Sequence, residues 1–243
     1  MIERSESDGI VTLTLAHGKA SAMDIELLEA LRRELTACDD ARAVILTGRG
    51  SIFCAGVDLF RLVDGGADYV RRFFPLLRDT MRQLFAMPMP VVAAANGHAI
   101  AGGAILVYAC DLRLMSAGRI GTPELLVGVP FPTAALEIVR FAVPQSQKYA
   151  YTGGTLPPDE ARTAGLIDEV VAAEALLDRA RELAAQLAAI PRESFRLTKA
   201  QLRAPAIELM SRDAGDARAL AVWSDAATHA HIREYLARTV RKS

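Results

Sequence analysis

Short apolar runs of strand length alternate with helical patterns through the first half of the chain, and this alternation restricts the folds open to it. The runs are rich in β-branched residues and lie at 10–15, 43–46, 91–95 and 112–115. Helical patterns lie between them: Asp24 can cap one helix, and residues 69–85 and 102–108 form others. Repeated strand–helix–strand units predict an α/β fold with parallel strand pairing.

The second half of the chain has a different character. Short helical patterns begin at residue 133, and from residue 173 the pattern is helical almost to the end, with breaks expected at Pro191 and Pro205. We therefore expect a core formed by residues 1–190 and a C-terminal helical region formed by residues 191–243.

Composition excludes several classes of protein. The 28 Lys and Arg balance 29 Asp and Glu, and a net charge of -1 gives no general attraction to nucleic acid or to an anionic membrane. The most apolar stretch, residues 87–110, is divided by prolines and glycines, so it predicts a strand, a turn and a buried helix rather than a membrane span.

The three cysteines are Cys38, Cys54 and Cys110, and they are not clustered. They indicate neither a disulfide framework nor a metal site, and they favour a reducing compartment. Because the first nine residues are polar and acidic rather than basic and apolar, they do not resemble a signal peptide. These features predict a cytoplasmic protein without a resident metal.

Two glycine-containing turns carry the strongest functional signal. Residues 53–58 (Phe-Cys-Ala-Gly-Val-Asp) and 96–103 (Asn-Gly-His-Ala-Ile-Ala-Gly-Gly) each follow an expected strand, and the second runs into a helix. The start of a helix has backbone N–H groups without partners, and small residues let a ligand oxygen approach them. Two such turns, if they converge, can form an oxyanion hole from main-chain donors.

The common nucleotide, zinc-protease and serine-hydrolase motifs are absent from the sequence. The two turns and several later segments instead closely resemble the enoyl-CoA hydratase/isomerase (crotonase) superfamily. The order and spacing of the similar segments match over most of the chain: 53–58, 96–103, 110–111, 121–124, 152–154, 160–168 and 198–199.

The resemblance implies a fold, an assembly and a substrate. The fold would be a crotonase-like spiral of β-β-α repeats with a C-terminal helical region that builds a homotrimer or a dimer of trimers. The substrate would be an acyl-CoA thioester, so that CoA is part of the substrate and no separate cofactor is needed. The expected role is in fatty acid metabolism.

The resemblance also assigns residues to the site. The backbone N–H groups of Ala55 and Gly102 would bind the thioester oxygen, and CoA would lie along the loop around residues 17–22. The acyl-CoA contacts expected in this way are Lys19, Ala20, Ala22, Ala55, Gly56, Asp58, Leu59, Gly102 and Phe131. From its position, Asp58 is also expected to cap the helix that follows.

One glutamate decides the expected reaction. Family hydratases commonly use two, and the position of one of them is Ile105 here, whereas the other is retained as Glu124. Ile105 cannot transfer a proton. A single glutamate of raised pKa is sufficient to take a proton from C2 of a 3-enoyl-CoA and to return it to C4. This pattern resembles the Δ3-Δ2 enoyl-CoA isomerase branch, with Glu124 as the acid and base.

Two alternatives remain open at this stage. The first is a hydratase that forms 3-hydroxyacyl-CoA, and the second is a protein that binds acyl-CoA without catalysis. Glu137 is a conceivable second carboxylate, although we expect it on a helix surface. Ala101 stands where many family members have glycine, and we expect it to be tolerated through a negative φ.

Overall fold

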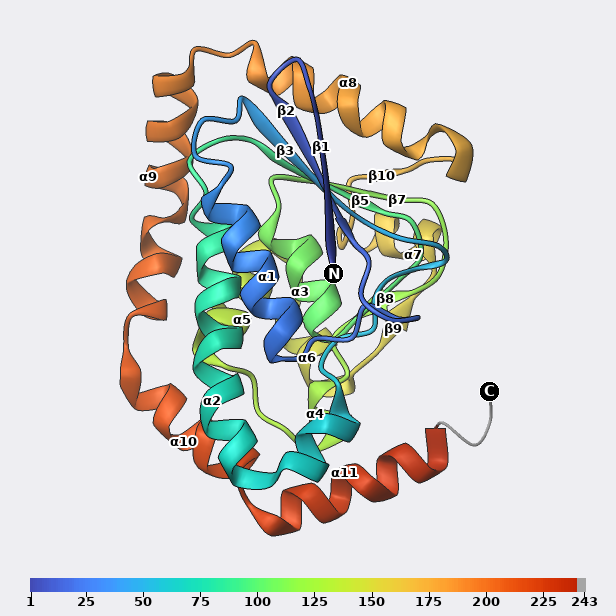
Figure 1. Ribbon diagram of the computed structural model, residues 1–243, viewed down its shortest axis with the longest axis vertical. Helices are drawn as coiled ribbons and strands as arrows, with labels where there is room; N and C mark the ends of the chain where they lie inside the picture. Colours follow the sequence, from blue (N-terminus) through green and yellow to red (C-terminus); the bar gives the residue numbers. More distant parts are fainter. Residues whose placement is uncertain (240–243) are drawn as a thin grey trace.

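A computed structural model describes residues 1–239, which form two sheets wound into a spiral and surrounded by helices (Figure 1). The larger sheet has the order β1-β2-β3-β5-β7-β10, and the smaller one has the order β4-β6-β8-β9. In the larger sheet β1 is antiparallel to β2, and the remaining neighbours are parallel. Its strands are β1 (Ile2–Ser7), β2 (Ile10–Leu15), β3 (Ala43–Gly48), β5 (Val91–Ala95), β7 (Leu112–Met115) and β10 (Glu169–Val170).

The spiral follows from a repeated unit in which one strand joins each sheet before a helix follows. The units are β3-β4-α2, β5-β6-α3 and β7-β8-α4, so the sequence-based expectation of a β-β-α spiral is confirmed. The smaller sheet consists of β4 (Ile52–Cys54), β6 (His98–Ile100), β8 (Ile120–Gly121) and β9 (Thr155–Leu156).

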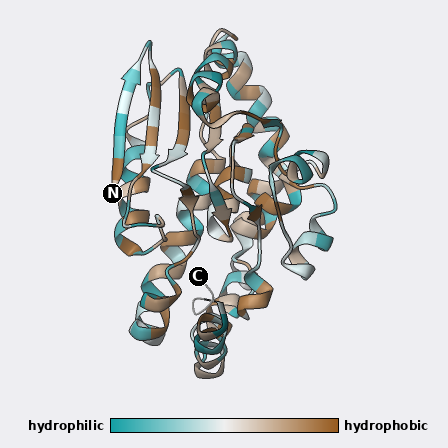
Figure 2. Ribbon diagram, turned by 90° about the vertical axis from the view of Figure 1, so that its right-hand side faces the viewer, coloured by the Kyte–Doolittle hydropathy of each residue, from teal (hydrophilic) through white to brown (hydrophobic). Residues whose placement is uncertain are grey.

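Alternate residues of a strand point to opposite faces of the sheet. Both sets are apolar in the larger sheet, so helices cover both of its faces. Val44 and Leu46 of β3 belong to the main core, whereas Ala43 and Ile45 pack against α8. The edge strand β1 is largely hydrophilic, and the strands behind it are hydrophobic (Figure 2). The helices before the C-terminal region are α1 (Ile25–Thr36), α2 (Leu59–Phe85), α3 (Gly102–Ala109), α4 (Glu124–Val127), α5 (Thr133–Ala142), α6 (Ser146–Thr152), α7 (Pro158–Thr163) and α8 (Leu176–Ala188), with a 3₁₀ turn at Ala173–Ala175.

Two expected helix caps are confirmed. Asp24 Oδ1 accepts a hydrogen bond from the Leu27 N–H at 2.8 Å, and Asp58 Oδ1 accepts one from the Arg61 N–H at 3.0 Å. The long helix α2 therefore begins at Leu59, ten residues before the start that its sequence pattern suggests. A kink at Gly66 (φ 63°) separates its first turns from the rest and hides the continuity of the pattern.

The C-terminal region consists of α9 (Arg192–Met210), α10 (Asp213–Trp223) and α11 (Ala226–Thr239), and all three pack on the spiral. The expected break at Pro205 is wrong, because α9 continues through it to Met210. Buried Arg203, Ala206 and Met210 hold both sides of the proline against the core. Packing therefore outweighs the hydrogen bond that the proline removes. Within residues 1–239, no helix has the length and apolarity needed to cross a bilayer.

A buried charge cluster attaches α9 to the spiral. Asp111 accepts hydrogen bonds from Lys199 Nζ at 2.7 Å, from Arg203 Nη2 at 2.8 Å and from the Val91 N–H at 2.7 Å. The Arg203 guanidinium lies 4.2 Å from the centre of the Phe85 ring. Asp111 thus compensates two cations whose side chains are only 7% and 5% exposed.

We expect Asp111→Ala to lower the free energy of unfolding by about 3–5 kcal/mol, because it leaves Lys199 and Arg203 buried without their anion. Urea unfolding at fixed protein concentration measures the change. Asp178→Ala is the control, since it removes a surface ion pair with Arg181 and is expected to stay near the wild type. Equal effects of the two substitutions would contradict this account of the cluster.

Candidate active site

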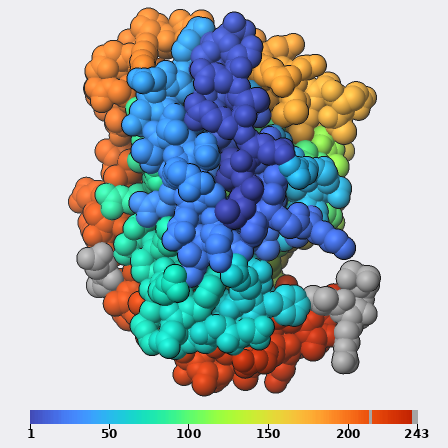
Figure 3. Space-filling view, in the orientation of Figure 1, coloured from blue at the N-terminus to red at the C-terminus, as the bar shows by residue number. Residues whose placement is uncertain are grey.

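A cavity of about 120 Å³ lies where the two glycine turns meet α2, α4, α5 and the C-terminal helices. Its walls are largely apolar, and Glu124 carries the one carboxyl group among the described residues that line it. The space-filling view shows the surface hollowed between the N-terminal segments and α11 (Figure 3). A largely apolar cavity with a few polar groups is a usual form for a ligand site.

Glu124 is the first residue of the short helix α4 and is 6% exposed. Neither of its carboxylate oxygens has a hydrogen-bond partner within residues 1–239. Burial therefore disfavours the charged form and raises the pKa of Glu124 to about 8. A carboxyl group with this pKa can both accept and donate a proton near neutral pH.

The backbone around α4 holds Glu124 at the cavity. The Val129 N–H donates to the Glu124 carbonyl at 3.1 Å, and Gly128 ends the helix with φ 92°. The positive φ favours glycine at this position, and a Cβ here would lie 2.6 Å from the His231 ring of α11, which would have to move. The C-terminal helix thus packs directly on the turn that carries Glu124.

The two glycine turns do converge, as the sequence suggests. A Cβ at Gly56 would lie 2.7 Å from the Ile100 carbonyl oxygen and 3.3 Å from the Gly102 nitrogen. A Cβ at Gly103 would lie 2.2 Å from the Cys54 carbonyl oxygen. Only glycine permits this approach, which places the backbone of residues 55–57 beside the start of α3.

The expected donor role of Ala55 is wrong in this arrangement. The Ala55 N–H donates to the Ala20 carbonyl at 3.0 Å, so it is already occupied. The N–H of Asp58 donates to the Met23 carbonyl at 2.9 Å, and Val57 between them directs its own N–H to the other side of the chain. No acceptor for the N–H of Val57 or Gly102 is found among residues 1–239, and both residues line the cavity.

Ala101 adopts a conformation that the sequence analysis did not expect. Its φ is +51° and its ψ is -123°, values typical of the first central position of a type II′ turn, where glycine is preferred. The negative φ expected for this alanine is therefore wrong. Its N–H donates to the Gly121 carbonyl at 2.8 Å, and its carbonyl accepts from the Ile105 N–H at 3.1 Å. These bonds hold Ala101 in the strained conformation.

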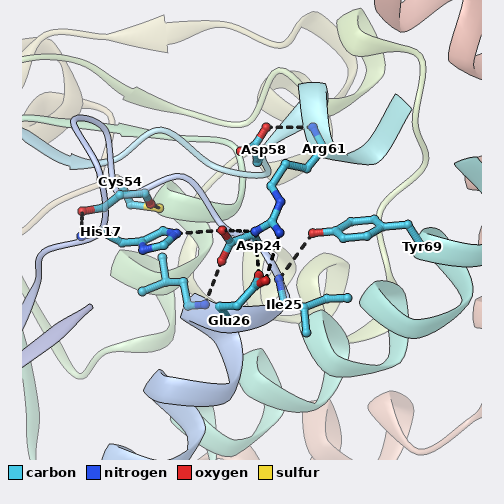
Figure 4. A network of polar contacts seen from close by, with 10 residues as sticks. His17, Asp24, Ile25, Glu26, Cys54, Asp58, Arg61 and Tyr69 are labelled. Atoms are coloured by element: carbon cyan, nitrogen blue, oxygen red, sulfur yellow. Dashed lines mark hydrogen bonds and ion pairs between the residues drawn. The ribbon is translucent and has the colours of Figure 1, made fainter. Parts of the chain in front are cut away.

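A polar network fixes the loop beside the first turn (Figure 4). Asp24 Oδ2 lies 2.7 Å from His17 Nε2 and 2.6 Å from Arg61 Nη1, and Arg61 also binds Glu26. Burial opposes the charge of Asp24, but the Leu27 N–H, His17 and Arg61 outweigh it, so the pKa of Asp24 lies below its usual value. The Cys54 thiol donates to the Ser21 carbonyl at 3.1 Å, which ties the loop to β4.

The structure distributes the other expected contacts unevenly. Ala55, Leu59 and Gly102 line the cavity with Glu124, and Gly56 packs behind it. Asp58 caps α2. Ala20 lies against Ala55, while Lys19 and Ala22 belong to the same loop outside the cavity lining.

Two other expectations change. Phe131 is not among the residues that line the cavity, because its neighbours Val129 and Pro132 occupy that wall while Phe131 packs half-buried against the core. Glu137 is not on the helix surface: its side chain is 7% exposed and pairs with Arg140 at 2.9 Å. It does not line the cavity either, so it provides no second carboxylate there.

Sequence reasoning missed two aromatic residues of the site. Trp223 of α10 and Tyr235 of α11 both line the cavity, although they are about 100 residues beyond Glu124 in the chain. The signal available was weak: Trp223 is the single tryptophan of the chain and lies in a helical segment. Nothing in the local pattern indicates which part of the spiral such a helix covers.

The spiral of β-β-α units and a cavity between its turns define an α/β protein of the crotonase type. The family model for enoyl-CoA hydratase/isomerase matches residues 5–240. The chain belongs to this family and is an acyl-CoA enzyme.

The relatives similar to this chain include proteins named as hydratases and proteins named as isomerases. A crotonyl-CoA hydratase of Syntrophomonas wolfei is 31% identical over 208 residues, which cover 82% of this chain and 79% of the relative. Enoyl-CoA delta isomerase 1 of Rattus norvegicus is 27% identical over 212 residues, or 84% of this chain and 73% of the relative. The solved human mitochondrial delta3-delta2-enoyl-CoA isomerase has a TM-score of 0.93 at 24% identity and covers 100% of this chain and 99% of its own, which shows the shared fold.

We expect Ala101→Gly to raise the free energy of unfolding by about 1 kcal/mol, because glycine adopts a positive φ without strain. Ala104→Gly, in the buried interior of α3, is the control and is expected to lower it by about 1 kcal/mol or more. Urea unfolding compares the two variants. If Ala101→Gly lost as much stability as Ala104→Gly, the result would contradict the interpretation that the backbone at Ala101 is strained.

Proposed function

We propose that the protein moves the double bond of a 3-enoyl-CoA to the 2 position, with Glu124 as the single acid and base. The observation that carries the proposal is a buried carboxyl group in a largely apolar cavity that two backbone N–H groups also line, with no hydrogen-bond partner for any of the three groups among residues 1–239. Ile105 lines the same cavity. It stands at the position where hydratases of this family commonly have a second glutamate.

The proposed reaction has two proton transfers. The Glu124 carboxylate takes a proton from C2, and the electron pair moves toward the thioester carbonyl to form an enolate. The N–H groups of Val57 and Gly102 stabilise the negative oxygen, with Val57 replacing Ala55 in the expected pair. The protonated Glu124 then returns the proton to C4, and the double bond closes between C2 and C3. The reaction exchanges no electrons with an external group, so it needs no cofactor besides the CoA of the substrate itself.

An apolar cavity suits this chemistry for two reasons. Fixed N–H dipoles act more strongly on a developing charge where water is excluded. Burial also raises the pKa of Glu124, which brings the strength of the base closer to that needed for a carbon acid. The loop of Lys19, Ala20 and Ala22 is the proposed contact for CoA, because it lies against the turn that carries Val57.

A hydratase is the second candidate, and the similarity to a crotonyl-CoA hydratase favours it. Glu124 alone would then have to orient water and deliver the proton. A protein that binds acyl-CoA without catalysis is the third candidate.

We also propose that the protein forms a homotrimer or a dimer of trimers, in keeping with the resemblance. Leu197 and Leu202 of α9 are 47% and 65% exposed, so they are apolar side chains available for contact with another subunit.

Glu124→Gln is expected to lower kcat for isomerisation of 3-hexenoyl-CoA by about 10²–10⁴-fold, because the amide neither accepts nor returns the proton. The absorbance of the conjugated product measures the rate. Glu137→Gln, a buried carboxyl group outside the cavity, is the matched control and is expected to keep near-normal activity. Formation of 3-hydroxyacyl-CoA from 2-enoyl-CoA without isomerisation would favour the hydratase instead.

The rate should also depend on pH with a definite sign. Glu124 must start as the carboxylate, and its pKa of about 8 means that the protonated form dominates at lower pH. We expect kcat/KM to increase about tenfold per pH unit up to roughly pH 8 and then to level off. Initial rates between pH 6 and 9 test this. A flat profile over that range would show that Glu124 does not titrate as the base.

A further inference from the structure

The last two helices close one side of the cavity, and the larger of the two aromatic side chains that they contribute is that of Trp223. Trp223 is 2% exposed and lines the cavity together with residues of α2 and of the start of α5: Leu77, Met81, Ala135 and Pro132, which immediately precedes α5. Helix α10, which carries it, packs beside α2 (Figure 1). The indole ring therefore forms part of the apolar wall of the cavity.

The ring is held in one orientation. Its Nε1–H donates to the Pro130 carbonyl at 2.7 Å, and a rotation would leave this buried donor without an acceptor. The ring of Phe74 meets it edge-on at 5.6 Å, and the ring of Phe73 stacks on it at 6.4 Å. These contacts come from α2 and from the loop before α5, so the wall does not depend on α10 alone.

Helix α10 is attached near both ends. Asp216 is buried, and its Oδ1 accepts a hydrogen bond from the Thr133 N–H at 2.7 Å, so α10 caps the start of α5. At the other end, the His229 ring nitrogen lies 2.8 Å from the Trp223 carbonyl oxygen. Residues 130–133 and α10 thus form one unit, and the wall has little freedom to swing away.

The volume of the cavity limits the size of the acyl group that it can hold. Its volume is about 120 Å³, and an apolar cavity of roughly 150 Å³ holds one benzene molecule of six carbons. By that proportion, the cavity accommodates about five carbon atoms. The reacting carbons of a 3-enoyl group already fill most of this space.

We propose that Trp223 determines the acyl specificity and restricts the enzyme to short chains of about four to six carbons, an inference that rests on the proposed acyl-CoA reaction at Glu124. The residue acts by excluding volume and does not take part in proton transfer. A long straight chain meets the indole ring, whereas a short one ends before it.

The wild-type enzyme is assayed with 3-enoyl-CoAs of four to ten carbons, and saturated acyl-CoAs of the same lengths are titrated calorimetrically. We expect kcat/KM for the ten-carbon substrate to be at least ~10-fold below that for the six-carbon substrate, with the same order in the binding constants. Trp223→Ala removes the wall and is expected to raise the ten-to-six-carbon ratio by ~10-fold or more.

Two variants serve as controls. Val222→Ala changes an exposed neighbour on the same helix and should leave the ratio unchanged. Trp223→Phe keeps an aromatic wall without the N–H and should shift the ratio less than Trp223→Ala does. If Trp223→Ala does not fold, Leu77→Ala enlarges the same cavity from α2 and is expected to relax the limit in the same direction.

The outcomes separate this inference from the proposed reaction. Turnover of all lengths with equal kcat/KM would overturn the limit and leave the isomerase intact. Preferential binding of short saturated acyl-CoAs without isomerisation would support the limit and reject the reaction. An unchanged ratio in a folded Trp223→Ala would reject Trp223 as the determinant.

Discussion

The close approach of two backbone turns is the constraint on which the site depends. Gly56 and Gly103 lie where any side chain would collide with the carbonyl of the facing turn. That contact brings Val57 and Gly102 to one cavity, and the loop of residues 17–24 supports it from outside. The loop is in turn fixed by Asp24, whose carboxylate is hydrogen-bonded to His17 and paired with Arg61. The arrangement is rigid because each part satisfies the hydrogen bonds of the next.

A buried carboxyl group without a partner is costly to the fold, and the structure maintains it. The carboxyl oxygens of Glu124 face an apolar cavity, so the charged form loses hydration without gaining a hydrogen bond from a described residue. Between its unfolded and folded pKa values, the folded state binds the proton more tightly, so this group makes the protein less stable as the pH rises from about 4.5 to about 8. Such a cost at one residue, in a cavity that the C-terminal helices seal, is typical of a functional group.

Much of the fold was predictable from the sequence because its signals are local. The apolar runs at β2, β3, β5 and β7, the caps at Asp24 and Asp58, and the two glycine turns all have near-neighbour patterns. The resemblance then supplied the spiral, and it is the source of the proposed role of Glu124. What failed depends on distant partners: the N–H of Ala55 is occupied by Ala20, and the φ of Ala101 is set by Gly121 and the start of α3.

The C-terminal contribution was equally beyond local reasoning. A helical pattern predicts that α10 and α11 exist, but not that Trp223 docks between α2 and Pro130. Pro205 shows the same limit, since the packing of Arg203, Ala206 and Met210 keeps α9 continuous through a residue that usually ends a helix.

The order of the spiral and the helices α9, α10 and α11 along the chain has a consequence for biosynthesis. The spiral is synthesised first, and the 52 residues from Arg192 to Ser243 follow at ~5–20 residues per second. Until α9, α10 and α11 dock on the spiral, the apolar side chains that line the cavity are open to solvent and to other nascent chains.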